Sequence, residues 1–187
     1  MTYQTIVSVD VLAQNIDNPN WVILDCRDSL MDKEFGYNSY LEGHIPSASY
    51  CYLYNDFSSP ITPTTGRHPL PEMTKLIEKL GHWGIDENTQ VVVYDDVSGA
   101  FAGRMWWQIR SLGHKNVAVL DGGLKFWLAQ KQAMSTEIPK VDSKQFIGVF
   151  DSEQLITVDE VQANIDKNNF SLLDARAAPR YRGEVEP

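Results

Sequence analysis

Residues 8–27 read SVDVLAQNIDNPNWVILDCR, and residues 157–176 read TVDEVQANIDKNNFSLLDAR. The two stretches align without a gap at a constant offset of 149 residues, and they share Val, Asp, Asn, Ile, Asp, Asn, Leu, Asp and Arg in register. A match of this length indicates two copies of one structural module. The second copy begins close to the end of the chain, so chemistry that belongs to it is expected beyond Pro187.

The repeated stretch carries a helix pattern followed by a strand pattern. Ser8 is a typical N-cap, and the apolar residues after it recur at helical spacing, namely Val9, Leu12, Ala13 and Ile16. Trp21 to Leu24 form a short apolar run that ends at Asp25, which is typical of a buried strand with a polar residue at its carboxyl end. The stretch therefore predicts one helix and one buried strand.

Strand and helix patterns continue to alternate as far as residue 131. The apolar runs at 91–94 and 117–120 predict strands, and helices are expected at 71–81, 100–112 and 124–131. Strands separated by helices are typical of parallel sheets with helices on both faces. The prediction is an α/β fold of three layers, α/β/α, with a central, mainly parallel sheet.

The chain is expected to contain one complete domain, a linker and the start of a second domain. Residues 1–131 form the complete domain, and residues 132–155, which lack a clear period, form the linker. Residues 156–187 begin the second domain with a capping box, Thr157 and Glu160, and a repeat of the first strand at Ser171 to Asp174. One helix and one strand do not close a core by themselves.

Composition excludes several classes of protein. The net charge of −9 disfavours a nucleic-acid or anionic membrane surface. No apolar run approaches the ~20 residues of a membrane span, and the first residues lack the features of a signal peptide. The two cysteines, Cys26 and Cys51, do not form a disulfide framework. These features predict a soluble, cytoplasmic protein.

The loop after the strand at 91–94 contains two adjacent carboxylates, Asp95 and Asp96. Loops at the carboxyl ends of parallel strands are the usual place for ligands, and the next helix begins here. Two carboxylates work against binding an anion at a helix N-terminus. We interpret both as caps of that helix or as solvated side chains. The segment contains no His and no third carboxylate, so a metal site is not expected here.

The cysteines and histidines do not assemble into a site by their spacing. Cys26 has Ala175 as its counterpart in the second copy, so it is interpreted as a small buried thiol, as is Cys51. His68 lies on a loop where it could line a cleft. The spacing of the residues alone predicts an α/β domain of unknown activity.

A series of motifs resembles one known family, the tandem-domain rhodaneses, which include thiosulfate and 3-mercaptopyruvate sulfurtransferases. The matching segments, in chain order, are LDCR (24–27), GHIPSA (43–48), GRHPLP (66–71), VVVYD (91–95), RMWW (104–107), GH (113–114), VLDGG (119–123), LDAR (173–176) and RYRG (180–183). The resemblance covers nearly the whole chain. One departure is Ser47, where the family usually has Gly.

The resemblance implies a rhodanese-like fold and a sulfurtransferase that needs no cofactor and no metal. The expected partners are a small anionic sulfur donor, thiosulfate or 3-mercaptopyruvate, and a cyanide or thiol acceptor, with sulfane sulfur carried on a Cys persulfide. In the family this Cys begins the loop after the fourth strand of the second domain, and the first domain has no Cys there. Asp95 occupies the first-domain position, so the complete domain is expected to be non-catalytic and the isolated chain inactive.

The resemblance also suggests substrate-binding residues. Arg180 stands where the family uses an Arg of the second domain to bind the donor, and Arg67 and His68 are expected to border the cleft between the domains. Mercaptopyruvate enzymes place an Asp near the position of Tyr52, so its absence favours thiosulfate.

Two other interpretations stay open at this stage. A Cys-less rhodanese-like domain can serve as an anion-binding or protein-binding module. Alternatively, Cys26 or Cys51 is itself the sulfur carrier, which the Ala175 counterpart of Cys26 and the lack of a base adjacent to Cys51 disfavour.

Overall fold

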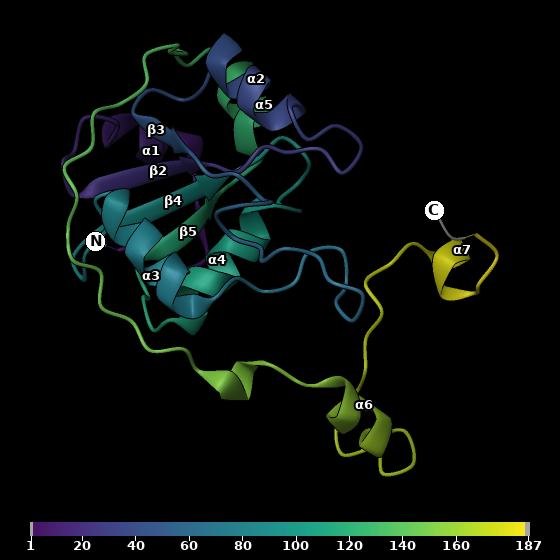
Figure 1. The fold of residues 1–187 in the computed structure, drawn as a ribbon. Helices are drawn as coiled ribbons and strands as arrows, with labels where there is room; N and C mark the ends of the chain where they lie inside the picture. Colours follow the sequence, from purple (N-terminus) through teal and green to yellow (C-terminus); the bar gives the residue numbers. More distant parts are fainter. Residues whose placement is uncertain (1, 186–187) are drawn as a thin grey trace. The chain divides into compact units, whose positions relative to one another are not determined.

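Five short strands form one parallel sheet in the computed structural model of the chain, which describes residues 2–185 (Figure 1). The strand order is β1-β5-β4-β2-β3, and every pair is parallel. The strands are β1 (Ile6–Val7), β2 (Trp21–Asp25), β3 (Ala48–Tyr50), β4 (Gln90–Tyr94) and β5 (Val117–Leu120). The predicted α/β fold with a parallel sheet is confirmed.

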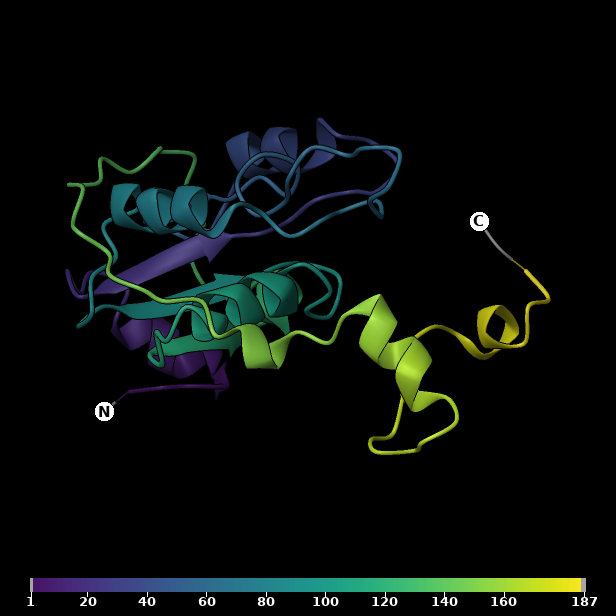
Figure 2. The same cartoon turned by 60° about the horizontal axis from the view of Figure 1, so that its bottom comes forward.

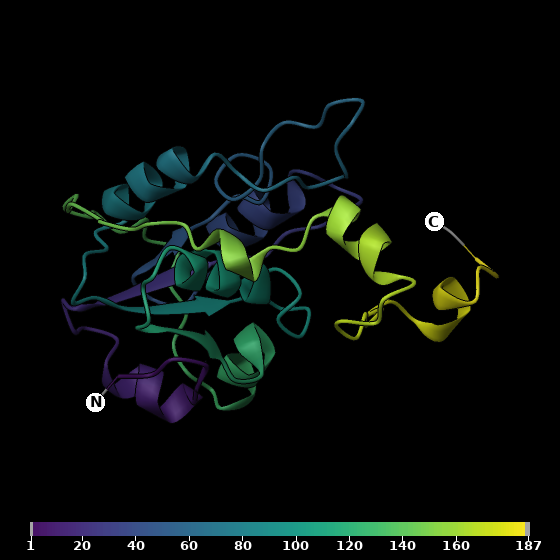
Figure 3. The same cartoon turned by 90° about the horizontal axis from the view of Figure 1, so that it is seen from below.

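Helices cover both faces of this sheet. One face carries α1 (Val9–Gln14) and α5 (Gly123–Ala129), and the other carries α3 (Met73–His82) and α4 (Ala102–Ser111) (Figure 3). A further helix, α2 (Phe35–Glu42), lies between β2 and β3 in the chain. Because apolar side chains of β4 alternate between the two faces, Val91 and Val93 pack under α3 and α4, whereas Val92 packs under α1 and α5.

None of the helices in residues 2–185 combines the length and the apolar character that a bilayer span requires.

The boundary of the first unit lies later than the sequence suggested. The chain divides into Met1–Asp151, the first unit, and Ser152–Pro187, the second unit. Residues 132–151 were expected to belong to a linker, yet their backbone bonds to the first unit, as in the amides of Lys144 and Asp151, which donate to Gly81 and Ser111. Phe146 is 6 % exposed and joins the core beneath α3 and α4. These contacts have no sequence period, so pattern alone did not reveal them.

The second unit contains the expected helix but lacks the expected strand. Its elements are a short 3-10 turn (Ser152–Gln154), α6 (Val158–Asn164) and α7 (Ala178–Tyr181), and α6 begins with the predicted capping box. Residues 171–174 run as coil between the two helices (Figure 2).

A strand needs hydrogen-bonded neighbours, which explains why residues 171–174 are coil although they repeat the sequence of β2. In the first copy, β2 lies between β3 and β4 and bonds to both. Within residues 152–185 the structure contains no strand to play either part. As a result Leu172 and Leu173 are 66 % and 88 % exposed, whereas their first-copy counterparts Ile23 and Leu24 are 2 % and 0 % exposed.

Candidate functional site

The carboxyl ends of β2, β3, β4 and β5 point to one edge of the sheet, as they must in a parallel sheet. Ligand sites of open α/β sheets form at this edge, where loops meet the N-termini of helices. The loop of residues 95–101 connects β4 to α4 at this edge. The backbone carbonyl of Asp95 also accepts a hydrogen bond of 2.9 Å from the amide of Leu124, so this loop contacts the start of α5.

The carboxylate of Asp95 is surrounded by backbone amides of its own loop. Oδ1 accepts hydrogen bonds from the N–H groups of Val97 (3.0 Å) and Gly99 (2.8 Å). Oδ2 accepts from those of Phe101 (2.8 Å) and Ala102 (2.9 Å), at the start of α4. We call these four N–H groups the amide cradle. Converging amides at a helix N-terminus bind an anion, and here the side chain of Asp95, 2 % exposed, is that anion.

These bonds confirm the interpretation of Asp95 as a cap of the next helix. Asp95 lies seven residues before Ala102 in the sequence, farther than the usual N-cap position. Asp96 differs from its neighbour. It is partly buried, and its Oδ1 is shielded from solvent without a hydrogen-bond partner in the part of the chain that the structure describes.

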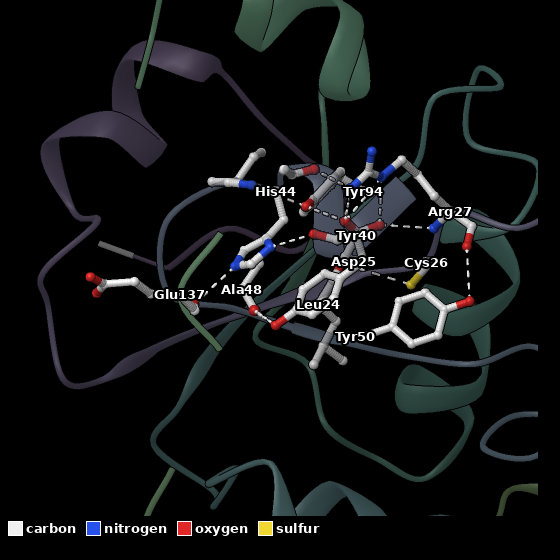
Figure 4. Close-up of polar contacts among 12 residues, drawn as sticks. Leu24, Asp25, Cys26, Arg27, Tyr40, His44, Ala48, Tyr50, Tyr94 and Glu137 are labelled. Atoms are coloured by element: carbon white, nitrogen blue, oxygen red, sulfur yellow. Dashed lines mark hydrogen bonds and ion pairs between the residues drawn. The ribbon is translucent and has the colours of Figure 1, made fainter. Parts of the chain in front are cut away.

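A buried polar network fixes the ends of β2 and β4 beside this loop (Figure 4). Arg27 and Asp25 form an ion pair with a shortest distance of 2.6 Å, and the same guanidinium donates to the carbonyl of Gly43 at 2.7 Å. The hydroxyl of Tyr94 donates to Asp25 at 2.6 Å and accepts from the amide of Ile45. Burial and the neighbouring Asp25 charge raise the pKa of Tyr94 well above its ordinary value, so it remains a neutral donor.

Both cysteines have the environment of packing residues. Cys26 and Cys51 are 0 % exposed, and both belong to the core beneath α3 and α4. Burial raises the pKa of each thiol. Because the thiolate is the reactive form, a raised pKa makes these sulfurs poor nucleophiles. The sequence-based interpretation of both as buried thiols is therefore confirmed.

Arg67 and His68 lie on the long loop between β3 and α3. Arg67 is exposed, whereas the ring of His68 is partly buried with its centroid 5.2 Å from that of Tyr54. Burial and the charges of Arg104 and Arg67 lower the pKa of His68, so the ring is neutral at physiological pH.

Arg104 ties this loop to α4, a role that the sequence did not reveal. Its Nη2 donates to the carbonyls of Phe57, His68 and Pro69 at 3.0 to 3.2 Å and contacts the hydroxyl of Ser58. The guanidinium thus joins two distant segments of the loop to the helix that begins at the amide cradle. Arg104 belongs to the RMWW motif, but its main partners are backbone carbonyls. The spacing of side chains along the sequence does not predict such partners.

Arg180 lies in α7 of the second unit, where its charge helps to lower the pKa of Asp174. Arg176 and Asp174 repeat the geometry of Arg27 and Asp25, with the same shortest distance of 2.6 Å. The hydrogen bonds from Arg176 are the main reason that the pKa of Asp174 falls to about 2. The Asp-x-Arg pair therefore forms in both copies, whether it is buried or exposed.

Within residues 2–185 the structure holds no group of three or more His, Cys, Asp or Glu side chains that could bind a metal ion.

Comparison with known proteins identifies the fold and its relatives. Residues 8–130 match the family model described as the rhodanese-like domain. The whole chain is 41 % identical to a probable 3-mercaptopyruvate sulfurtransferase of Pseudomonas aeruginosa, covering 66 % of that protein. It is 31 % identical over 99 % of its length to the thiosulfate sulfurtransferase of Bos taurus, covering 64 % of that protein.

Solved structures agree with these matches. SseA from Escherichia coli, described as a 3-mercaptopyruvate sulfotransferase with the rhodanese fold, superposes with a TM-score of 0.86 at 28 % identity. The match covers 98 % of this chain and 70 % of SseA. The chain thus spans about two thirds of the length of these relatives, and 58 % of another, a putative thiosulfate sulfurtransferase of Mycobacterium tuberculosis.

Proposed function

Because this chain belongs to the rhodanese-like family, we propose that it is part of a sulfurtransferase and holds the domain that does not carry the nucleophile. The overall reaction moves sulfane sulfur from thiosulfate or 3-mercaptopyruvate to cyanide or a thiol. With thiosulfate, a Cys thiolate attacks the outer sulfur, the S–S bond breaks, and sulfite leaves with the electron pair. Cyanide then removes the outer sulfur of the persulfide as thiocyanate, which restores the thiolate.

The amide cradle is the observation that carries this proposal. Four N–H groups at a helix N-terminus would stabilise a thiolate and lower its pKa. Asp95 places a carboxylate there instead, and this carboxylate uses all four donors. A second anion has no free donor in the cradle and is repelled by the first. The first unit therefore keeps the architecture of a persulfide loop without its sulfur atom.

We assign the nucleophile to a second domain of which residues 152–187 are the beginning. Leu172 and Leu173 match core residues of β2 and are exposed, which suits a segment whose partner strands come from elsewhere. The relatives are longer than this chain by about the length of such a domain remainder. Arg180 would bind the sulfonate or carboxylate of the donor in that domain.

The first unit would contribute Arg67 and the neutral ring of His68 to the border of the substrate cleft. Arg104 holds their loop in place. Tyr52, which stands where an Asp supports mercaptopyruvate in the resembling enzymes, favours thiosulfate as the donor.

The first test is a thiosulfate:cyanide assay of this chain, with thiocyanate detected as its ferric complex. We expect formation at the rate of a protein-free blank. Thiocyanate formation that Cys26→Ser or Cys51→Ser abolishes would overturn the proposal, because a thiol of the first unit would then be the carrier.

The second test places a thiol in the amide cradle. In Asp95→Cys we expect a thiol pKa below the ordinary ~8.5, measured from the pH dependence of alkylation. We also expect intact-mass spectrometry to show uptake of one sulfur atom from thiosulfate, with the unsubstituted chain as the control. An ordinary thiol pKa and no sulfur uptake would show that the cradle is not of the persulfide type.

A further inference from the structure

A pocket of about 520 Å³ lies beside the amide cradle, on the α4 side of the sheet, and extends past the end of β5 to the start of α5. Its apolar lining comes from Ile6 on β1, Val119 and Leu120 on β5, and Trp106 on α4. Its polar lining comes from the loop after β4 (Asp95, Asp96 and Ser98), the turn after β5 (Asp121) and helix α5 (Lys125). We call it the Trp106 pocket.

The pocket exists because β1 is short and lies at the sheet edge. On this face α3 and α4 cover the inner strands, so Ile6 is left 58 % exposed. Trp106 forms a fixed wall, since its indole N–H donates to the carbonyls of Gln4 (3.0 Å) and Val117 (3.1 Å). The result is a rigid apolar floor that a ligand can cover without reorganising the fold.

The charged lining of the pocket is predominantly negative. The carboxylate of Asp95 is saturated by the amide cradle, so Asp96 and Asp121 are the carboxylates available to a ligand. Asp96 is partly exposed in the lining; its Oδ1 is shielded from solvent and lacks a hydrogen-bond partner within residues 2–185, and its charge also helps to raise the pKa of Arg27. A buried carboxylate oxygen without a donor is costly, and a positively charged N–H donor compensates that cost best. Lys125 is the one cation in the lining and comes from the solvent side of α5.

We propose that the Trp106 pocket binds a small organic ammonium ion with an apolar body. The ammonium group would donate to Asp96, with Asp121 adding to the attraction, and the apolar body would lie on Ile6 and Val119 beside Trp106. This site is separate from the persulfide chemistry proposed above, because it requires neither the missing nucleophile nor the sulfur donor. It can therefore be tested whether or not the chain is active.

The test is a titration of this chain with 2-phenylethylammonium, followed by calorimetry and by ¹H–¹⁵N NMR. We expect saturable binding, with the largest shifts at the amides of Gly99 and Gly122 and at the indole N–H of Trp106. Two matched probes separate the contributions of the charge and of the apolar group to binding. 2-Phenylethanol keeps the phenyl ring without the charge, and ethylammonium keeps the charge without the phenyl ring. Both should bind at least about tenfold more weakly.

Two variants and one control locate the site. Asp96→Asn, which keeps the shape and removes the charge, should weaken binding of 2-phenylethylammonium about tenfold. Ile6→Ser should weaken it several-fold by removing part of the apolar floor. Asp10→Asn, an exposed acid in the first turn of α1, is the control and should bind like the unsubstituted chain.

Equal binding of 2-phenylethanol, or full affinity in Asp96→Asn, would overturn the assignment of a cation site. No saturable binding, with all variants folded by circular dichroism, would overturn the site itself.

Discussion

Asp95 shows how one side chain changes the chemistry of a loop without changing its shape. The loop presents four amides toward one point, and the residue at that point determines whether they hold a carboxylate or a thiolate. The sequence indicated a cap because two acids precede a helix, and the capping bonds are as expected. It did not show that one carboxylate takes all four donors, since that depends on how the backbone curls between residues 95 and 102.

Replacing Asp95 by Ala should destabilise the first unit. The change leaves four amides without their acceptor, so we expect a loss of at least about 2 kcal/mol in the free energy of unfolding. Urea denaturation followed by far-UV circular dichroism measures this loss. Asp96→Ala is the matched control, because its carboxylate has no such set of donors and its buried Oδ1 lacks a partner, so this change should not destabilise the first unit. Equal losses in the two variants would contradict the role given to the cradle.

At the scale of elements, long periodic segments were predicted well and short ones were not. The patterns predicted β2, β4 and β5 and the helices α1, α3, α4 and α5 close to their observed bounds. The two-residue strand β1 is too short to show alternation.

Helix α2 was missed because its sequence carries neither a side-chain cap nor a clear apolar stripe. Tertiary contacts hold it in place. A side chain at Gly36 would collide with the carbonyl of Arg27, and Tyr40 stacks on His44 with ring centroids 3.9 Å apart. These contacts are made with residues outside the helix, so the helix sequence alone does not reveal them.

His114, which follows α4, should make stability depend on pH. Its Nε2 bonds to the carbonyl of Thr89 before β4 (2.9 Å), and burial lowers the pKa of the ring. The unfolded chain has the ordinary pKa of about 6.5, so below that pH it binds a proton that the folded chain does not. The free energy of unfolding should therefore fall as pH decreases from 7.5 to 5.5, by at most about 1.4 kcal/mol per pH unit for this group.

Urea denaturation across this pH range measures the dependence. His114→Gln should reduce the dependence of the free energy of unfolding on pH. The ring of His68 is more exposed, so His68→Gln should reduce this dependence less. An unchanged slope in His114→Gln would show that this ring does not titrate differently in the two states.

At the scale of the whole molecule, the position of the domain boundary can be tested by truncation. Both apolar clusters of the first unit end at or before Phe150. A chain of residues 1–151 should therefore unfold with a free energy within about 1 kcal/mol of that of the full chain. Ending at residue 131, the boundary expected from the sequence, removes Phe146 and should cost about 3 kcal/mol or more. Thermal and urea unfolding of the two truncated chains measure the difference, and equal stability would restore the linker interpretation.

The sequence by itself determined the features that depend on local periodicity and on neighbours along the chain. These are the parallel α/β fold, the repeat, the capping box of α6, and the Asp-x-Arg pairs at 25–27 and 174–176, which form the same geometry in buried and exposed surroundings. The capping box and the Asp-x-Arg pairs need only residues a few positions apart, and the alternation of strand and helix patterns along the chain indicates the parallel α/β fold.

Only the tertiary structure decided the features that need distant partners. Residues 132–151 belong to the first unit because Phe146 packs in the core beneath α3 and α4. Residues 171–174 are coil because no strand lies beside them within residues 152–185. The Trp106 pocket likewise joins segments that lie far apart in the chain, and the amide cradle depends on how the backbone of one loop curls. Backbone atoms are the same in every residue, so their arrangement is set by the fold and not by the side-chain pattern.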